Sequence, residues 1–228
     1  MYIVYFLTAC ACLLTLWSFI NVNSEGVPYA HPSYTHLGWT VHGKFNIANV
    51  ELKANHKRLI LKIVDERSDF ERERNFLASL GKDSTAEYVV ELKDAIEPNS
   101  GEPRFCLVEE LLGENLHDYL HKRPSLKELD RKNLALSVLN AIAAVHNKRV
   151  VHGDFKPHQI CFDPNQRGFN VKLVDFDSAF SLDDGSHRLD RYTQLYAAPE
   201  VLPRTILNEF ALADIENFIN QCSIFSKR

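Results

Sequence analysis

Residues 151–160 read VHGDFKPHQI, a stretch that places Asp154 and Lys156 directly after a short apolar run. A second apolar run, VKLV, is followed by Asp175. Short apolar runs of this kind are typical of buried strands, so both aspartates are expected at strand ends. Carboxylates and an ammonium placed together can orient a hydroxyl, hold a metal ion and neutralise charge, which phosphoryl transfer requires. Taken singly, each aspartate could equally cap a turn.

A second pair of charges lies in apolar surroundings earlier in the chain. Lys62 interrupts the apolar run LILKIV, where an unpaired ammonium would be costly to bury. The following stretch, SDFERERNFLASLGK, has helical spacing and places Glu73 beside the apolar face. An ion pair between Lys62 and Glu73 would explain both charges. The alternative is an edge-strand lysine that reaches solvent and a solvated glutamate.

Composition limits the class of protein. The chain has 228 residues, of which 45% are hydrophobic and 25% charged, with a net charge of −4. These values suit one globular domain, and the acidic balance argues against a nucleic-acid partner. The five cysteines form no CxxC pair or Cys/His cluster, so neither a zinc site nor a disulfide framework is expected.

The N-terminal segment suggests a targeting signal. The first twenty residues carry no charge and are numerous enough to cross a bilayer as a helix. Residues 1–24 are therefore predicted to be a signal peptide or a membrane anchor, and a missing basic n-region leaves that choice open. The segment predicts a secretory-pathway location, either secreted or single-pass membrane-anchored, with membrane contact if it is not cleaved. Residues 25–37 are expected to form a linker.

The segments quoted above, in their order, resemble the eukaryotic protein kinase family from about Gly38 to Phe218. Lys62 resembles the ATP-anchoring lysine and Glu73 its helix partner. HGDFKPHQ is similar to the catalytic loop, DFD from Asp175 to the metal-binding motif, and TQLYAAPE to the end of an activation segment.

The resemblance implies an α+β, two-lobed protein-kinase-like fold over residues 38–228. The first lobe, about residues 38–110, would be small and β-rich with one helix. The second lobe, about residues 111–228, would be helical and incomplete, because the chain ends ten residues after Phe218. Besides a protein substrate, we expect a protein partner that covers the incomplete lobe.

The same resemblance implies roles for individual residues, with ATP and Mg²⁺ as cofactors. Asp154 would orient the substrate hydroxyl and Lys156 would stabilise the transferred phosphoryl group. Asp175 and Gln159 would bind the metal. The nucleotide would also contact the ends of the phosphate loop GKFNIANV and the hinge between the lobes; these contacts are Gly43, Val50, Glu110 and Leu112. By this alignment Glu109 is an unusual acidic residue at the back of the pocket.

Several departures from the family pattern keep the function open. Phe45 and Ala48 stand where the phosphate loop usually has glycine, and Ile60 replaces a small alanine above the adenine ring. Gln159 replaces an asparagine, and Gly153 replaces the arginine that pairs with an activation-loop phosphate. The main hypothesis is a protein Ser/Thr kinase, and the alternative is a pseudokinase that acts as a binding or scaffold module. A third reading is a small-molecule phosphotransferase, because H-G-D also occurs in such enzymes.

Overall fold

The computed structural model describes residues 31–40, 46–98, 104–166, 168–183 and 192–197. The predicted signal or anchor segment (residues 1–24), the loop with Gly43 and Phe45, and the residues after 197 lie outside this range, so the structure does not test the predictions about them. Within it, no helix has the length and apolar character needed to cross a membrane.

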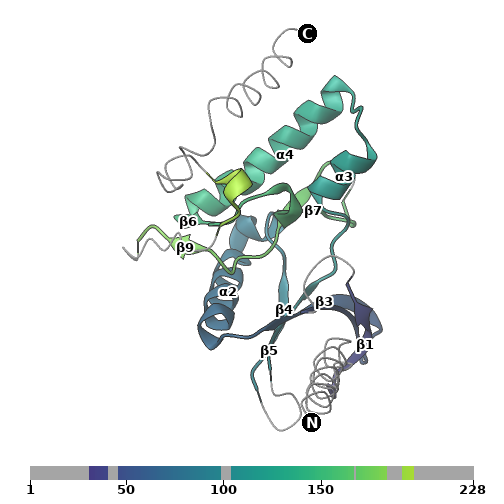
Figure 1. The fold of residues 1–228 in the computed structure, drawn as a ribbon, viewed down its shortest axis with the longest axis vertical. Helices are drawn as coiled ribbons and strands as arrows, with labels where there is room; N and C mark the ends of the chain where they lie inside the picture. The colour runs from purple at the N-terminus through teal and green to yellow at the C-terminus, as the bar shows by residue number, and fades with distance from the viewer. Residues whose placement is uncertain (1–30, 41–45, 99–103, 167, 184–191, 198–228) are drawn as a thin grey trace, which may run out of the picture.

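A five-stranded antiparallel sheet forms the first lobe, in the order β1-β2-β3-β5-β4. Figure 1 shows α2 (Arg67–Leu80) beside this sheet. The predicted strands and their helix are confirmed. The first strand begins inside the range predicted as a linker, because Tyr34 is buried in the sheet core and donates a hydrogen bond to Asp94 Oδ2 at 2.8 Å. The strands are β1 Tyr34–Trp39, β2 Ile47–Leu52, β3 Lys57–Val64, β4 Leu92–Ile96 and β5 Phe105–Glu110.

Strand alternation gives this sheet two different faces. Successive side chains in a strand point to opposite faces, and directly paired residues share a face. The face that holds Lys62 is called the inner face, and the opposite one the outer face. The register of β2, β3 and β5 places Ile47, Asn49, Ile60, Lys62, Leu107 and Glu109 on the inner face. The outer face carries the buried apolar residues Ala48, Val50, Leu59, Leu61, Cys106 and Val108.

Helix α2 packs on part of the inner face. Phe70 lies against Leu107 and Val64, while Leu77 and Leu80 continue the apolar stripe toward the second lobe. The helix ends at Gly81, whose N–H donates to Leu77 O at 2.8 Å. Glu73 lies within the stripe and is fully buried, as the helical spacing predicted.

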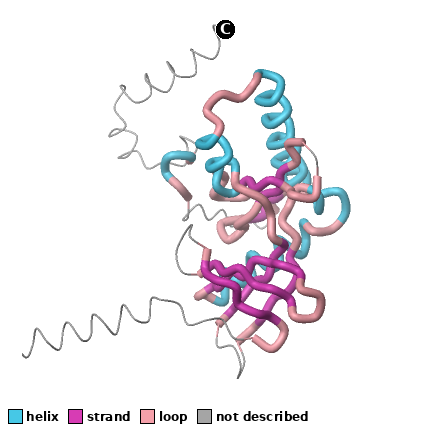
Figure 2. The backbone as a smooth tube through the Cα atoms, turned by 90° about the vertical axis from the view of Figure 1, so that its right-hand side faces the viewer, coloured by secondary structure: helices cyan, strands magenta, loops and turns pink. Residues whose placement is uncertain are grey.

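In its described residues, the second lobe combines two α-helices with two short β-ribbons. Figure 2 shows the strands of the sheet gathered in one part of the molecule and the long helix in the other. The ribbons hold two loops, residues 152–159 and 174–179, next to each other. The elements are α3 Leu116–Lys122, α4 Glu128–Asn147, β6 Val150–Val151 paired with β9 Phe180–Ser181, and β7 Ile160–Phe162 paired with β8 Val171–Leu173.

The two lobes are joined by more than the connecting segment 111–115. Before β4 begins, Val90 N donates to Leu173 O at 2.9 Å, and Leu173 N donates to Tyr88 O at 2.8 Å. These bonds attach the first lobe to β8, the strand that leads to Asp175. The α+β, two-lobed fold is therefore confirmed, with the inner face of the sheet directed at the loops of the second lobe.

Candidate active site

Lys62 and Glu73 form the buried ion pair that the sequence predicted. Lys62 Nζ lies 2.9 Å from both carboxylate oxygens of Glu73. Glu73 Oε1 also accepts the backbone N–H of Phe176 at 3.2 Å. The pair thus links β3, α2 and the segment after β8, and Lys62 is held in one position.

Asp175 completes this cluster from the second lobe. Its Oδ1 lies 2.5 Å from Lys62 Nζ, and its Oδ2 accepts a bond from Gln159 Nε2 at 2.5 Å. Its backbone has a φ of +67°, a left-handed conformation that Asp adopts more readily than most residues. This turn directs the carboxylate at the first lobe, while the next residue, Phe176, is fully buried against His152 with 4.8 Å between ring centroids.

One ammonium therefore faces several carboxylates. Burial alone would lower the pKa of Lys62, but the charges of Glu73 and Asp175 raise it above its ordinary value. Burial raises the pKa of Glu73 to about 7, although Lys62 opposes this shift. Burial would also raise the pKa of Asp175, yet Lys62 holds it below its ordinary range. Asp175 is consequently the carboxylate that stays ionised most readily, as a metal ligand requires.

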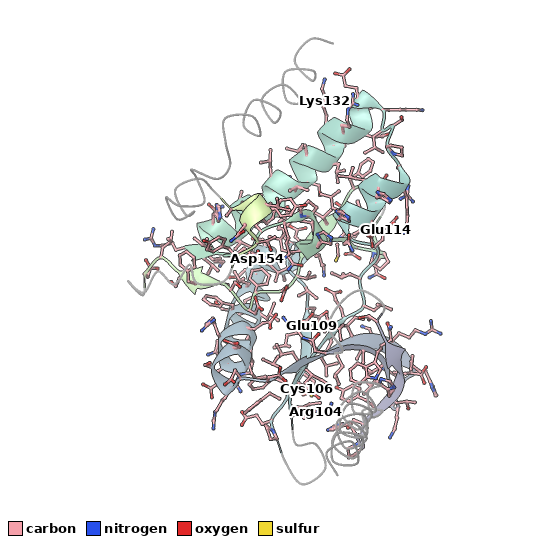
Figure 3. All side chains as sticks on the ribbon, viewed as in Figure 1. Arg104, Cys106, Glu109, Glu114, Lys132 and Asp154 are labelled. Atoms are coloured by element: carbon pink, nitrogen blue, oxygen red, sulfur yellow. The ribbon has the colours of Figure 1, made fainter. Side chains whose placement is uncertain are left out.

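Glu109 is the second-last residue of β5, and its side chain lies on the inner face of the sheet. Figure 3 shows it between the lower part of the sheet and Asp154 in the second lobe. It pairs with Ile60 across the strands and is 6% exposed. Its Oε1 is buried and has no hydrogen-bond partner among the described residues. Burial raises the pKa of Glu109 to about 8, with a further increase from the charge of Glu73.

Asp154 and Lys156 lie together in the loop after β6. Lys156 Nζ contacts Asp154 Oδ2, and the other oxygen, Asp154 Oδ1, accepts the backbone N–H of Thr193 at 2.7 Å. Lys156 Nζ also donates to Thr193 Oγ1 at 2.8 Å. A carboxylate that has one oxygen on an ammonium and the other on an N–H is fixed in orientation. This geometry suits a group that receives a hydroxyl.

Gly153 explains a departure from the expected loop sequence. Its φ is +83°, and a Cβ atom at this position would lie 2.1 Å from the backbone oxygen of Ser178. Any side chain would therefore force the loop away from the Asp175 segment. The arginine expected at this position does not fit this backbone. The close packing of the two loops therefore explains why the position is glycine.

Gln159, predicted as a metal ligand, is buried beside Asp175. Its amide nitrogen is turned to the aspartate, so the amide would have to rotate before its carbonyl oxygen could face a cation. Oxygen donors are the ligands Mg²⁺ prefers, and it commonly binds one or two carboxylates together with substrate phosphates. Asp175, with Gln159 after rotation, fits that donor set. The described residues contain no group of three or more His, Cys, Asp or Glu side chains suited to a metal.

The two hinge residues predicted to contact the nucleotide, Glu110 and Leu112, lie at the end of β5 and just after it. The carboxylate of Glu110 accepts the N–H of Glu91 at 2.8 Å and pairs with Lys172 Nζ at 2.5 Å. Lys172 is itself buried in β8. The Glu110 side chain thus connects the lobes, which leaves the backbone to contact a nucleotide. Leu112 follows in the connecting segment and is partly buried against the core.

Val50 is not where the sequence placed it. The prediction put this residue beside the nucleotide, but its side chain lies on the outer face, fully buried and paired with Leu59. Asn49, which pairs with Ile60, shares the inner face with Lys62 and was missed. A shift of one residue moves a side chain to the opposite face. The sequence feature that could have identified Asn49 is the turn at residues 53–56, because this turn sets the register of β2 on β3.

Comparison with known proteins gives one consistent result. The chain matches the sequence model of the protein kinase domain over residues 42–211. It is 28% identical over 154 residues to the carbon catabolite-derepressing protein kinase of Saccharomyces cerevisiae, covering 67% of this chain and 23% of that protein. It is 30% identical over 116 residues to the phosphorylase b kinase gamma catalytic chain, liver/testis isoform, of Bos taurus, covering 50% and 27%. The chain spans about a quarter of the length of these relatives.

The comparisons contradict the predicted secretory-pathway location. The relatives are described as a catabolite-derepressing protein kinase and a catalytic chain of phosphorylase b kinase, and neither description names a secreted or membrane-anchored protein. The prediction relied on residues 1–24, which carry no charge but lie outside the described residues. An uncharged stretch meets the length requirement for a signal or an anchor without being specific for either.

Proposed function

The chain belongs to the protein kinase family, and on that premise we propose that it transfers a phosphoryl group from Mg²⁺-bound ATP to Ser or Thr hydroxyls of a protein. The observation that carries the proposal is the joint placement of two charged sets. One is Lys62 with Glu73 and Asp175, and the other is Asp154 with Lys156. Phosphoryl transfer depends on such placement, because its transition state is stabilised by positioning and charge neutralisation.

The first set serves the nucleotide. Lys62, which donates hydrogen bonds to both carboxylate oxygens of Glu73, would present its charge to the α- and β-phosphates. Asp175, with the carbonyl oxygen of Gln159 as a second ligand, would hold the Mg²⁺ ion that neutralises the phosphate charge. In the geometry described, Lys62 lies directly on Asp175, so nucleotide and metal would enter between these two side chains.

The second set serves the acceptor. Asp154 would receive the proton of the substrate hydroxyl, and Lys156 would neutralise charge on the transferred group. Support for an aliphatic hydroxyl comes from Thr193, whose Oγ1 already accepts a hydrogen bond from Lys156. A serine or threonine side chain of a substrate has the same chemistry and could reach the same ammonium.

A second candidate function, a pseudokinase that acts as a binding module, is favoured by the inner face itself. Ile60 places a branched side chain on the inner face, where a base would lie, and the Gln159 amide presents nitrogen rather than oxygen to Asp175. These features weaken nucleotide and metal binding without disturbing the fold. The main proposal is preferred because the charged side chains it needs are present and positioned.

The test measures binding and transfer separately on the full chain. A ligand that binds only the folded state raises the melting temperature. We expect Mg²⁺-ATP to raise it in the wild type and in Asp154→Asn, but not in Lys62→Met. Radiolabelled phosphoryl transfer to a mixture of Ser/Thr peptides should occur only in the wild type.

Each result has one meaning. Binding without transfer in the wild type supports the binding module. Equal transfer by Asp154→Asn and the wild type would contradict the proposed role of Asp154. A folded chain whose melting temperature does not respond to Mg²⁺-ATP contradicts the main proposal.

A further inference from the structure

Glu109 lies on the path that a bound nucleotide would take. It shares the inner face with Lys62, the proposed phosphate anchor, and it directly precedes Glu110 at the proposed hinge. A nucleotide with phosphates at Lys62 and its base at the hinge therefore passes Glu109. The side chain is almost completely buried, and within the described part of the chain its Oε1 has no hydrogen-bond partner.

Among the described residues, no cation forms an ion pair with Glu109. Lys62 makes its contacts with Glu73 and Asp175, and Lys172 pairs with Glu110. Burial, together with the charge of Glu73, raises the pKa of Glu109 to about 8, so Glu109 keeps its proton near neutral pH. The titratable or charged groups that face it are Lys62 from β3, Glu73 from α2, Glu110 from β5, Cys161 from β7 and Asp175 after β8.

A protonated carboxyl group offers one donor and one acceptor side by side. The matching edge on a nucleobase has an amino donor next to a ring-nitrogen acceptor, and adenine presents this pattern at N6 and N7. Guanine presents two acceptors at the same edge, O6 and N7. The acid can satisfy only one of them, and a buried polar atom left unpaired is costly.

We propose that Glu109 reads the base of the nucleotide, with its carboxyl O–H donating to a ring nitrogen of adenine and its carbonyl oxygen accepting the adenine amino group. The inference rests on the proposed function, since it needs a nucleotide between Lys62 and the hinge. Glu109 thereby selects adenine over guanine nucleotides and over purines without the amino group.

Three nucleotides and two variants test this role in the full chain. The probes are the Mg²⁺ complexes of ATP, GTP and purine riboside triphosphate, which lacks the amino group, with dissociation constants from calorimetry at pH 7. We expect the wild type to bind ATP about tenfold more tightly than either of the others. Glu109→Gln keeps a donor beside an acceptor and should keep this preference. Glu109→Leu has neither and should bind all three within about twofold of each other.

A pH series separates the carboxyl from the amide. Above about pH 8 the carboxyl group loses the O–H that faces the ring nitrogen, which ATP and purine riboside triphosphate share, so the wild type should bind both about tenfold more weakly at pH 9 than at pH 7. Glu109→Gln does not ionise and should bind each of these nucleotides with the same affinity at both pH values. This comparison stands if Glu109→Leu does not fold.

The outcomes distinguish this inference from the proposed function. A wild type that binds ATP with no preference at pH 7, or with a preference that Glu109→Leu retains, overturns base reading alone. An affinity for ATP that falls no more between pH 7 and pH 9 in the wild type than in Glu109→Gln does the same. Failure of a folded wild type to bind any of the three nucleotides overturns the proposed function and the inference together.

Discussion

The two faces of the five-stranded sheet are made from the same strands, yet one face carries apolar side chains and the other carries charged ones. On β3, Leu59 and Leu61 point to the outer face, into a core of apolar side chains. Ile60 and Lys62 alternate with them and point to the inner face, where Lys62 meets carboxylates from α2 and from the second lobe. The outer face stabilises the lobe by burying apolar area. The inner face holds the charge of Lys62, whose partners come from α2 and from the second lobe.

The outer face should show the largest loss of stability. Leu61→Ala removes a fully buried side chain, so the free energy of unfolding should fall by about 2–5 kcal/mol. Chemical denaturation measures this change. Leu129→Ala, at an exposed position on α4, is the control and should stay within about 0.5 kcal/mol of the wild type. If both variants lose the same stability, the outer face is not the core of the lobe.

The inner face should show the largest loss of nucleotide binding. Lys62→Met removes the ammonium proposed to hold the phosphates, so the affinity for Mg²⁺-ATP should fall by at least about tenfold. Calorimetry on folded protein measures it. Lys57→Met, at the exposed start of the same strand, should leave the affinity unchanged. Equal affinities in the two variants would remove Lys62 from the nucleotide site.

The buried acid of the inner face should make stability depend on pH. The pKa of Glu109 rises from 4.5 to about 8 on folding, so between these values the folded state binds more protons than the unfolded state. The free energy of unfolding should therefore fall as pH rises through this window, by at most about 1.4 kcal/mol per pH unit for this group. Glu73, whose pKa is raised to about 7, contributes with the same sign.

Urea denaturation from pH 5 to pH 9 measures this slope. Glu109→Gln should flatten it, whereas Glu87→Gln, at an exposed position, should leave it as in the wild type. A slope unchanged in Glu109→Gln would mean that Glu109 is already ionised in the folded protein.

Two adjacent residues on β2 give the smallest effects and the sharpest test of the two faces. Val50→Ala, on the outer face, should lower the free energy of unfolding by about 1–2 kcal/mol and leave nucleotide affinity unchanged. Asn49→Ala, on the inner face, should change stability by less than about 0.5 kcal/mol and alter nucleotide affinity by about threefold. Thermal denaturation and calorimetry check the pair. The reverse pattern would shift the register of β2 by one residue.

The sequence by itself determined the architecture and the ion pair. The charge of Lys62 inside an apolar strand, and of Glu73 within an apolar helix stripe, predicted their pairing, because a buried charge must find a partner. The strands, α2 and the loops at Asp154 and Asp175 followed from local periodicity and from the resemblance to protein kinases. Local patterns of this kind depend only on residues that are close together in the sequence, so no tertiary information was needed to find them.

Only the tertiary structure decided which side chains share a face of the sheet and which buried polar groups have hydrogen-bond partners. The pairing of β2 with β3 moved Val50 away from the site and brought Asn49 to it, because register depends on a partner strand. The contact with Ser178 O explains Gly153, and that oxygen belongs to a loop more than twenty residues away. The unpaired carboxyl oxygen of Glu109 likewise emerges only once β3, α2 and the second lobe surround it, since burial and hydrogen bonding are properties of the folded chain.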